Sequence, residues 1–141
     1  MAPVVLNDET MKYISMFENI TRARVKDCII KEDKLIFIVP KHQVILALGK
    51  NNENIKRLKG LFKKNIDIIG FSDKLDVFVK NIFHNFNLQN IQVESRDEKS
   101  YVYVSVNLKD KGKIIGKNGN NLKLAREIVG RHFDVGDIII S

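Results

Sequence analysis

The sequence predicts an α+β protein in which one arrangement of helices and strands occurs twice. Three observations predict it: a repeated loop sequence, amphipathic spacing behind each copy of that loop, and a run that alternates apolar and polar residues. We expect each copy to follow the order α-β-β-α-α-β, with a three-stranded sheet covered by helices. The first domain would span residues 1–70 and the second residues 71–141.

The repeated loop reads GKNN at residues 49–52 and GKNG at residues 116–119, an offset of 67 residues. Apolar residues behind the two loops obey the same offset, with a spacing of three, three and one that places them on one face of a helix. Chance can supply a matching tetrapeptide, but matched helical phase behind it indicates a duplication. The paired positions are Ile55/Leu122, Leu58/Ala125, Leu61/Ile128 and Phe62/Val129.

Amphipathic helices are expected at the start of each copy and on both sides of each loop. Ser72 or Asp73 is placed to cap the early helix of the second copy, because a side-chain oxygen there accepts hydrogen bonds from unpaired backbone N–H groups. The early helices carry Met11, Ile14, Phe17 and Ile20 in the first copy, and Leu75, Phe78, Val79, Ile82 and Phe86 in the second. The helices around the loops span about residues 43–48 and 54–62, and about residues 111–115 and 121–133.

The clearest strand alternates over residues 101–108, and this period of two predicts one buried face. The matching run in the first copy is residues 35–39, which Pro40 should end because proline lacks a donor for the strand ladder. One face of the clearest strand carries Val102, Val104, Val106 and Leu108, and the other carries Tyr101, Tyr103, Ser105 and Asn107. The remaining strands are expected at about residues 24–30, 67–69, 88–95 and 138–140.

The chain is a cation with a net charge of +7 and a pI near 9.5, which favours an anionic partner such as nucleic acid or an acidic membrane. Its apolar runs, such as residues 35–39 and 44–48, are too short to span a bilayer. The N-terminus lacks the basic region and long apolar core of a signal peptide. A single cysteine, Cys28, cannot form an internal disulfide. We therefore expect a cytoplasmic protein, and a monomer.

Neither an enzyme nor a metal or cofactor site is predicted. His42, His84 and His132 are scattered singly, and one cysteine cannot supply a zinc site. We expect His132, near the end of a helix, to be solvated or to stabilise the helix dipole. A nucleotide-hydrolase loop is also excluded, since Lys111 stands where its first glycine is needed and Asn118 where its hydroxyl is needed.

The second loop has the residues that a phosphate-holding turn needs. Glycine has no Cβ, so it adopts positive φ and lets another backbone approach closely. The following helix would present unpaired N–H groups and its dipole to an anion. Lys117 adds a positive charge, Asn118 adds a neutral donor, and Ile114 and Ile115 could form a floor for bases lying flat. A Gly-x-x-Gly sequence alone more often marks a plain turn between helices, so its helical and strand setting carries the interpretation.

This setting, with I-I-G-x-x-G at residues 114–119, resembles the K-homology (KH) domain in its type II arrangement. The resemblance implies a loop that clamps about four nucleotides of single-stranded nucleic acid. Two such units joined almost without a linker resemble the NusA transcription factor family in its short archaeal form, over about residues 8–140. That implies binding of single-stranded RNA in transcription elongation or termination, with RNA polymerase as a further candidate partner. The implied RNA-binding residues are Ile114, Ile115, Gly116, Lys117, Asn118, Gly119, Asn121, Lys123 and Arg126, with Gly49, Lys50, Asn51 and Asn52 in the first loop.

Two features depart from that family. Bacterial relatives carry an N-terminal polymerase-binding domain and an oligonucleotide-binding barrel, and the predicted elements leave no room for either. Asn52 stands where the second glycine of the motif is expected. Asparagine tolerates a left-handed backbone, but its side chain occupies the space where phosphate would come closest. We therefore expect the second loop to be the main clamp and the first to bind RNA more weakly.

Two other functions stay open at this point. The folds could dock on RNA polymerase as a protein–protein adaptor, or they could belong to a ribosome-associated KH protein that reads structured RNA by shape. The short linker at residues 70–72 predicts a nearly fixed orientation of the two domains. Tyr101 and Tyr103 share a strand face and could stack on bases or pack on the neighbouring domain, and packing is favoured.

Overall fold

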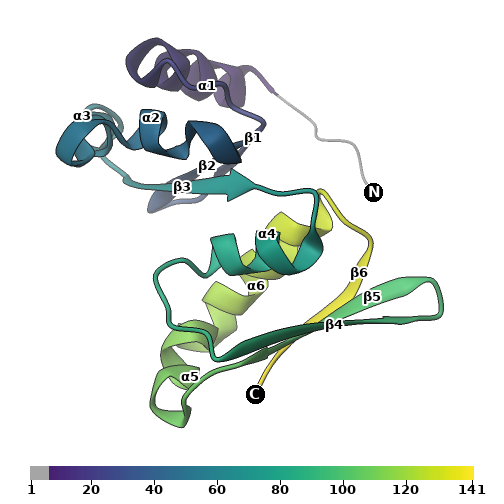
Figure 1. Cartoon of the computed structure of the whole chain (residues 1–141). Coiled ribbons are helices and arrows are strands. Elements are labelled where there is room, and N and C mark those ends of the chain that lie inside the picture. The colour runs from purple at the N-terminus through teal and green to yellow at the C-terminus, as the bar shows by residue number, and fades with distance from the viewer. Residues whose placement is uncertain (1–6) are drawn as a thin grey trace. The chain divides into compact units, whose positions relative to one another are not determined.

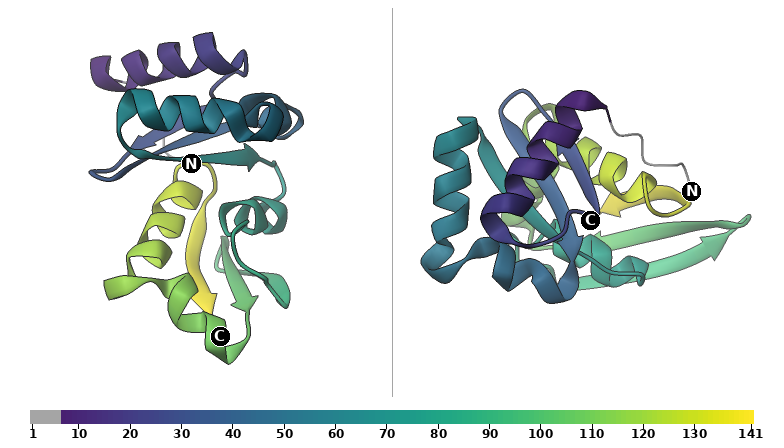
Figure 2. Two further views of the ribbon diagram at one scale, coloured as in Figure 1. Left: turned by 90° about the vertical axis from the view of Figure 1, so that its left-hand side faces the viewer. Right: turned by 90° about the horizontal axis from the view of Figure 1, so that it is seen from above.

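The computed structural model describes residues 7–141, which form two compact units with the boundary between Ser72 and Asp73. Each unit has its own three-stranded sheet, with helices on one face of it (Figures 1 and 2). The element order α-β-β-α-α-β occurs in both units, so the predicted fold class is confirmed. No helix within residues 7–141 is long and apolar enough to cross a membrane.

In the first unit, α1 begins after Asn7, whose side-chain Oδ1 accepts a hydrogen bond of 2.8 Å from the Thr10 N–H. This bond satisfies one of the unpaired donors at the helix start. A short 3-10 turn at Lys41–Gln43 connects β2 to α2. The elements are α1 (Asp8–Thr21), β1 (Asp27–Ile30), β2 (Lys34–Pro40), α2 (Val44–Leu48), η2 (Lys50–Asn52), α3 (Glu53–Phe62) and β3 (Asn65–Phe71).

The second unit repeats this plan with a longer hairpin. Asp97 and Glu98 both have positive φ and join β4 to β5, which is the backbone of a tight two-residue hairpin turn. The hairpin extends past the helices of its own unit (Figure 2), which agrees with the exposure of most β4 residues. The elements are α4 (Leu75–Ile82), β4 (Asn90–Arg96), β5 (Lys99–Ser105), α5 (Leu108–Ile115), η3 (Lys117–Gly119), α6 (Asn120–Gly130) and β6 (Val135–Ile140).

Both sheets have the same topology, with the first two strands antiparallel and the last strand parallel to the central one. The order is β1-β2-β3 in the first unit and β4-β5-β6 in the second. In each sheet the last strand pairs with the central one in parallel, as Phe37 does with Ile68 and Val102 with Ile138, and the second sheet has a register shift between Ser100 and Tyr101. The shared topology places the loop between α2 and α3 at the same point of the element order as the loop between α5 and α6.

Apolar side chains from the helices and one sheet face form a separate core in each unit. In the first, the rings of Phe17 and Phe37 stack with centroids 4.1 Å apart. In the second, Phe78 on α4 is fully buried and lies 5.7 Å from the Phe133 ring. Other core residues are Leu35, Val39, Ala47 and Leu58 in the first unit, and Val102, Val104, Ile114, Ala125, Ile128, Val129 and Ile138 in the second.

Several element ends differ from the sequence-based prediction. The strand predicted over residues 101–108 ends at Ser105, and Leu108 instead begins α5 with 88% of its surface exposed. The alternation was misleading because Asn107 is the N-cap of α5 and no longer part of the ladder. Pro40 is included in β2, as its last residue. The helix expected over residues 121–133 ends at Gly130.

The start and end of α4 also differ from the prediction. The N-cap position belongs to Lys74, which makes no side-chain capping bond, so neither Ser72 nor Asp73 caps this helix. Both stand too early in the chain, because helical backbone begins only at Leu75. The helix ends at Ile82, and Phe86 lies in a following turn, where its ring packs against Phe83.

His132 is buried, contrary to the expectation of a solvated residue. Only 8% of its surface is exposed, and its ring meets Phe78 edge-on with centroids 5.8 Å apart. The chain turns inward after α6 ends at Gly130, which brings the imidazole into the core. Within the part of the chain that the structure describes, no group of three or more His, Cys, Asp or Glu side chains is placed to hold a metal ion.

Candidate nucleic-acid interface

The first glycine of each loop has a backbone conformation that other residues do not adopt readily. Gly49 has φ 75° and ψ 170°, and Gly116 has φ 81° and ψ 169°. This region of positive φ and extended ψ is essentially restricted to glycine, because a Cβ there collides with the backbone. Both loops therefore leave the preceding helix by the same sharp turn, which reverses the chain before α3 and α6.

The third and fourth residues of the two loops also have matching backbone conformations. Asn51 and Asn118 are both left-handed, with φ 55° and ψ 33° in the first loop and φ 57° and ψ 23° in the second. Asn52 follows with φ 57° and ψ 28°, close to the φ 73° and ψ 14° of Gly119. The prediction that asparagine can preserve the turn is confirmed, since Asn52 adopts the left-handed conformation that this residue type tolerates.

Hydrogen bonds within the second loop use some of its backbone N–H groups. The Gly116 N–H donates to the Gly112 carbonyl at 2.9 Å, and the Gly119 N–H donates to the Gly116 carbonyl at 3.0 Å. The Asn120 N–H donates to the Lys117 carbonyl. The N–H groups of Lys117 and Asn118 take no part in these three bonds, which makes them the candidate donors to an anion in this turn.

The first loop has the same bonds. The Gly49 N–H donates to the Ile45 carbonyl at 3.1 Å, and the Asn52 N–H donates to the Gly49 carbonyl at 3.2 Å. The Glu53 N–H donates to the Lys50 carbonyl. Lys50, Asn51 and Asn52 are exposed, as are Lys117 and Asn118 in the second loop. Each loop therefore exposes one lysine and at least one asparagine to solvent, on a backbone with the same internal hydrogen bonds.

The other residues assigned from the sequence lie in three different environments. Ile114 is fully buried in the core, which leaves Ile115, half-buried, as the apolar side chain beside the loop. Lys123 is exposed, and its Cε lies 3.9 Å from the point that a Cβ on Gly119 would occupy. Lys123 therefore stands next to the loop and adds a second positive charge there.

Arg126 is held by the edge strand β6. Its Nε lies 2.9 Å from Oδ1 of Asp137, and its Nη2 donates to the Ile138 carbonyl at 3.2 Å. These two bonds connect α6 to the edge strand of the sheet. No local sequence pattern indicates these bonds, because Arg126 and Asp137 become neighbours only when β6 lies beside α6.

Comparison with known proteins agrees with this geometry. A model of the NusA-like second KH domain matches residues 75–140, and a model of the KH domain matches residues 12–97. A protein of Thermoplasma acidophilum named probable transcription termination protein NusA is 34% identical over 141 residues, covering 100% of this chain and 98% of that protein. The chain belongs to the archaeal NusA-like KH family.

Other members support the same assignment. The probable transcription termination protein NusA of Methanococcus vannielii is 36% identical over 135 residues, which cover 96% of this chain and 78% of that protein. A solved structure described as the crystal structure of APE1850 superposes with a TM-score of 0.78 at 34% identity, covering 96% of this chain and 100% of that one. The match therefore spans nearly the whole of the Thermoplasma acidophilum protein and of the solved chain, and about three quarters of the Methanococcus vannielii protein.

The tyrosines on the outer sheet face of the second KH unit contact other residues of the same sheet. The Arg96 guanidinium lies over the Tyr101 ring, 4.3 Å from its centroid, and also donates to the Tyr103 hydroxyl. On the other side, the Tyr101 ring covers Gly136, where a Cβ would come within 2.5 Å of the ring. Tyr101 therefore packs against Arg96 and Gly136 within its own sheet, which favours packing over base stacking. Packing of Tyr101 and Tyr103 on the neighbouring domain stays a prediction.

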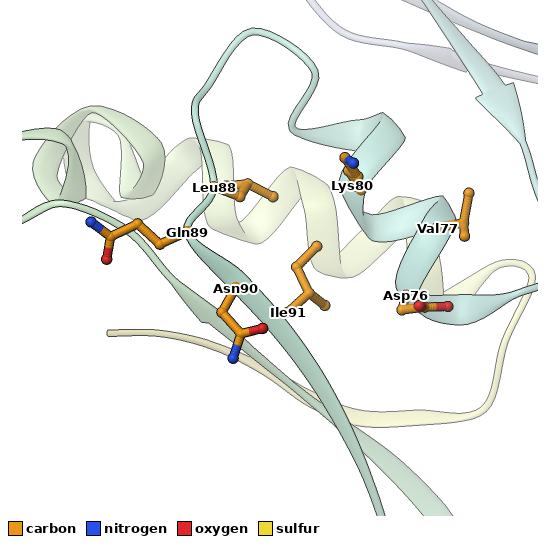
Figure 3. A pocket seen from close by; sticks show the side chains of 7 residues that line it. All are labelled: Asp76, Val77, Lys80, Leu88, Gln89, Asn90 and Ile91. Carbon is orange, nitrogen blue, oxygen red and sulfur yellow. The ribbon is translucent and has the colours of Figure 1, made fainter.

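A cavity of about 340 Å³ in the second KH unit lies between α4 and the start of β4. Leu88 and Ile91 extend toward the helix, whereas the amide groups of Gln89 and Asn90 turn away from it (Figure 3). Among the described residues that line it, the charged ones are Asp76 and Lys80, one of each sign. The cavity lacks the cation excess that a phosphate chain needs, so the loops remain the better candidate for contact with nucleic acid.

Proposed function

We propose that this chain binds single-stranded RNA through its two Gly-Lys-Asn loops and acts in transcription elongation or termination. The observation that supports it most is the shared loop geometry: each loop combines backbone N–H groups that take no part in the loop's own hydrogen bonds with an exposed lysine, Lys50 or Lys117. Phosphate groups are recognised by that combination of backbone donors and positive charge. Membership of the NusA-like family, whose members are named as termination proteins, supports the link to transcription.

The second loop is the stronger clamp in this proposal. Its fourth residue is Gly119, so a phosphate can approach the backbone closely, and Lys123 adds charge beside it. In the first loop the side chain of Asn52 stands at that position and is exposed. The backbone conformation is nearly the same in both loops, and Lys56 matches Lys123 at the repeat offset, so the difference in affinity arises from the Asn52 side chain and from Glu53, which stands where the second loop has Asn120. Each loop would hold a single strand mainly through phosphates, so affinity falls as salt rises.

Paired charge reversals test the proposal. The variant Lys117→Asp/Asn118→Asp disables the second loop, and Lys50→Asp/Asn51→Asp is its matched control in the first. We expect the affinity for a labelled unstructured RNA, measured by fluorescence anisotropy, to fall at least tenfold, about 1.4 kcal/mol, in the second-loop variant. The first-loop variant should lose less. A larger loss from the first loop overturns the ranking of the clamps.

The same titration separates the other candidate functions. Unchanged RNA binding in both charge-reversal variants would contradict binding through the loops and favour an adaptor that docks on RNA polymerase. A duplex that competes as well as a single strand would favour a protein that reads structured RNA by shape. The expected result is competition by single strands only, since a loop that holds backbone phosphate beside an open groove needs unpaired bases to fill that groove.

A further inference from the structure

Two asparagines occupy the same place relative to the two loops. Asn54 lies near the start of α3, and its Nδ2 donates to the Leu46 carbonyl at 3.2 Å. Asn121 lies near the start of α6, and its Nδ2 donates to the Lys113 carbonyl at 3.1 Å. Each bond spans eight residues and links the helix after the loop to the helix before it. The loop is thereby closed at its base.

The first glycine of each loop leaves room for this amide. A Cβ on Gly49 would come within 2.8 Å of Cγ and Nδ2 of Asn54. A Cβ on Gly116 would come within 2.9 Å of Cγ of Asn121. Real Cβ atoms essentially never approach so closely, so the missing side chain and the amide fit together. Glycine makes the sharp turn, and asparagine fills the space inside it.

The bond satisfies a backbone group that the preceding helix leaves unpaired. The last carbonyls of a helix have no partner within that helix, and a side-chain donor can provide one. Leu46 and Lys113 are in the last turn of α2 and α5, so their carbonyls are of this kind. The bond therefore fixes the angle at which the loop leaves its helix. It thereby also fixes the direction of the backbone N–H groups in the loop.

The fourth loop position shows no comparable constraint. A Cβ on Gly119 would meet only Cε of Lys123, at 3.9 Å, which is an ordinary contact with a flexible side chain. Asn52 already occupies the equivalent position in the first loop without any change of backbone conformation. The geometry shared by the two loops thus consists of the first glycine and the later asparagine, and not of the two glycines of the motif.

We propose that Asn54 and Asn121 are positioning residues, which hold each loop in its phosphate-ready conformation before RNA arrives. The effect of this role on binding rests on the proposed function. The hydrogen bond from the asparagine to the preceding helix, here called the lock, is a property of the RNA-free protein. It reassigns Asn121, which the sequence placed among the RNA-contacting residues: its amide is directed to the Lys113 carbonyl. A preset loop binds more tightly because less ordering is required on binding.

The experiment measures loop order without RNA in the full chain. Asn121→Ala and Asn54→Ala each serve as the control for the other, and backbone ¹⁵N heteronuclear NOE values report motion at residues 50–52 and 117–119. We expect Asn121→Ala to lower the values at 117–119 and to leave 50–52 unchanged, and Asn54→Ala to do the reverse. Unchanged values in the affected loop would overturn the lock. If one variant does not fold, the other tests the same lock independently.

A measurement of affinity for a labelled oligouridine of twelve nucleotides completes the test. Asn121→Ala should weaken binding by about fivefold, roughly 1 kcal/mol, with little change in melting temperature. Weaker binding with unchanged NOE values would mean that Asn121 contacts RNA directly, which overturns the positioning role. If the wild-type chain binds no RNA, the proposed function fails, while the NOE values still decide whether the lock exists.

Discussion

The two loops have one backbone conformation but different surfaces. Gly49 and Gly116 share a conformation that glycine alone adopts readily, whereas the fourth residues, Asn52 and Gly119, share a left-handed conformation open to asparagine as well. The two loop tetrapeptides differ only at this fourth position, where the backbone admits both residues. The two glycines of the motif thus have separate roles: the first makes the turn, and the second leaves the backbone accessible.

The largest expected effect comes from placing a Cβ at the first position. Gly116→Ala should lower the free energy of unfolding by about 3 kcal/mol, because it combines strained backbone with a collision against Asn121. Gly119→Ala is the matched control and should cost only about 1 kcal/mol, from left-handed backbone alone. Urea unfolding followed by circular dichroism measures both. Equal costs would show that the two glycines are not distinct in the way the geometry indicates.

An exchange of the fourth residues tests access to the backbone. Gly119→Asn should lower the affinity for single-stranded RNA by about fivefold, roughly 1 kcal/mol, since it places a side chain where phosphate approaches. Asn52→Gly should raise the affinity, because it opens the first loop. Anisotropy titrations of both variants at one fixed salt concentration give the comparison. If Gly119→Asn bound as well as the wild type, the difference between the loops would have to arise from a neighbouring charge such as Glu53, which stands where the second loop has Asn120.

The sequence predicted the fold because its signals are local. The repeat at an offset of 67 residues and the periodicity behind each loop gave the element order without any tertiary information. The predicted ends of elements were wrong where a local sequence pattern continues past the point at which the backbone conformation changes. Leu108 keeps the alternation of β5 although the chain has already turned at Asn107, and Phe86 keeps the helical phase after α4 has ended.

The contacts of the site were harder to predict than its position. The loops themselves were evident, but the bond from Asn121 to Lys113 depends on the φ of Gly116, which brings residues eight apart together. One signal did exist, since Asn54 and Asn121 obey the repeat offset just as the loops do. The contact between Arg126 and Asp137 left no such signal, because it forms across the edge of a sheet.

The smallest effects separate two cations on α6 that the sequence treated alike. Arg126→Ala should lower the free energy of unfolding by less than about 1 kcal/mol, because its partner Asp137 is 42% exposed and exposed ion pairs are weak. RNA affinity should stay unchanged, because its guanidinium is held at β6. Lys123→Ala should do the opposite and weaken RNA binding with no loss of stability, since Lys123 is exposed beside the second loop. Thermal unfolding and anisotropy titration of both variants measure this. If Arg126→Ala weakened RNA binding as much as Lys123→Ala does, the interface would have to extend from the loop to the edge strand, and Asp137 would then be a partner that RNA displaces.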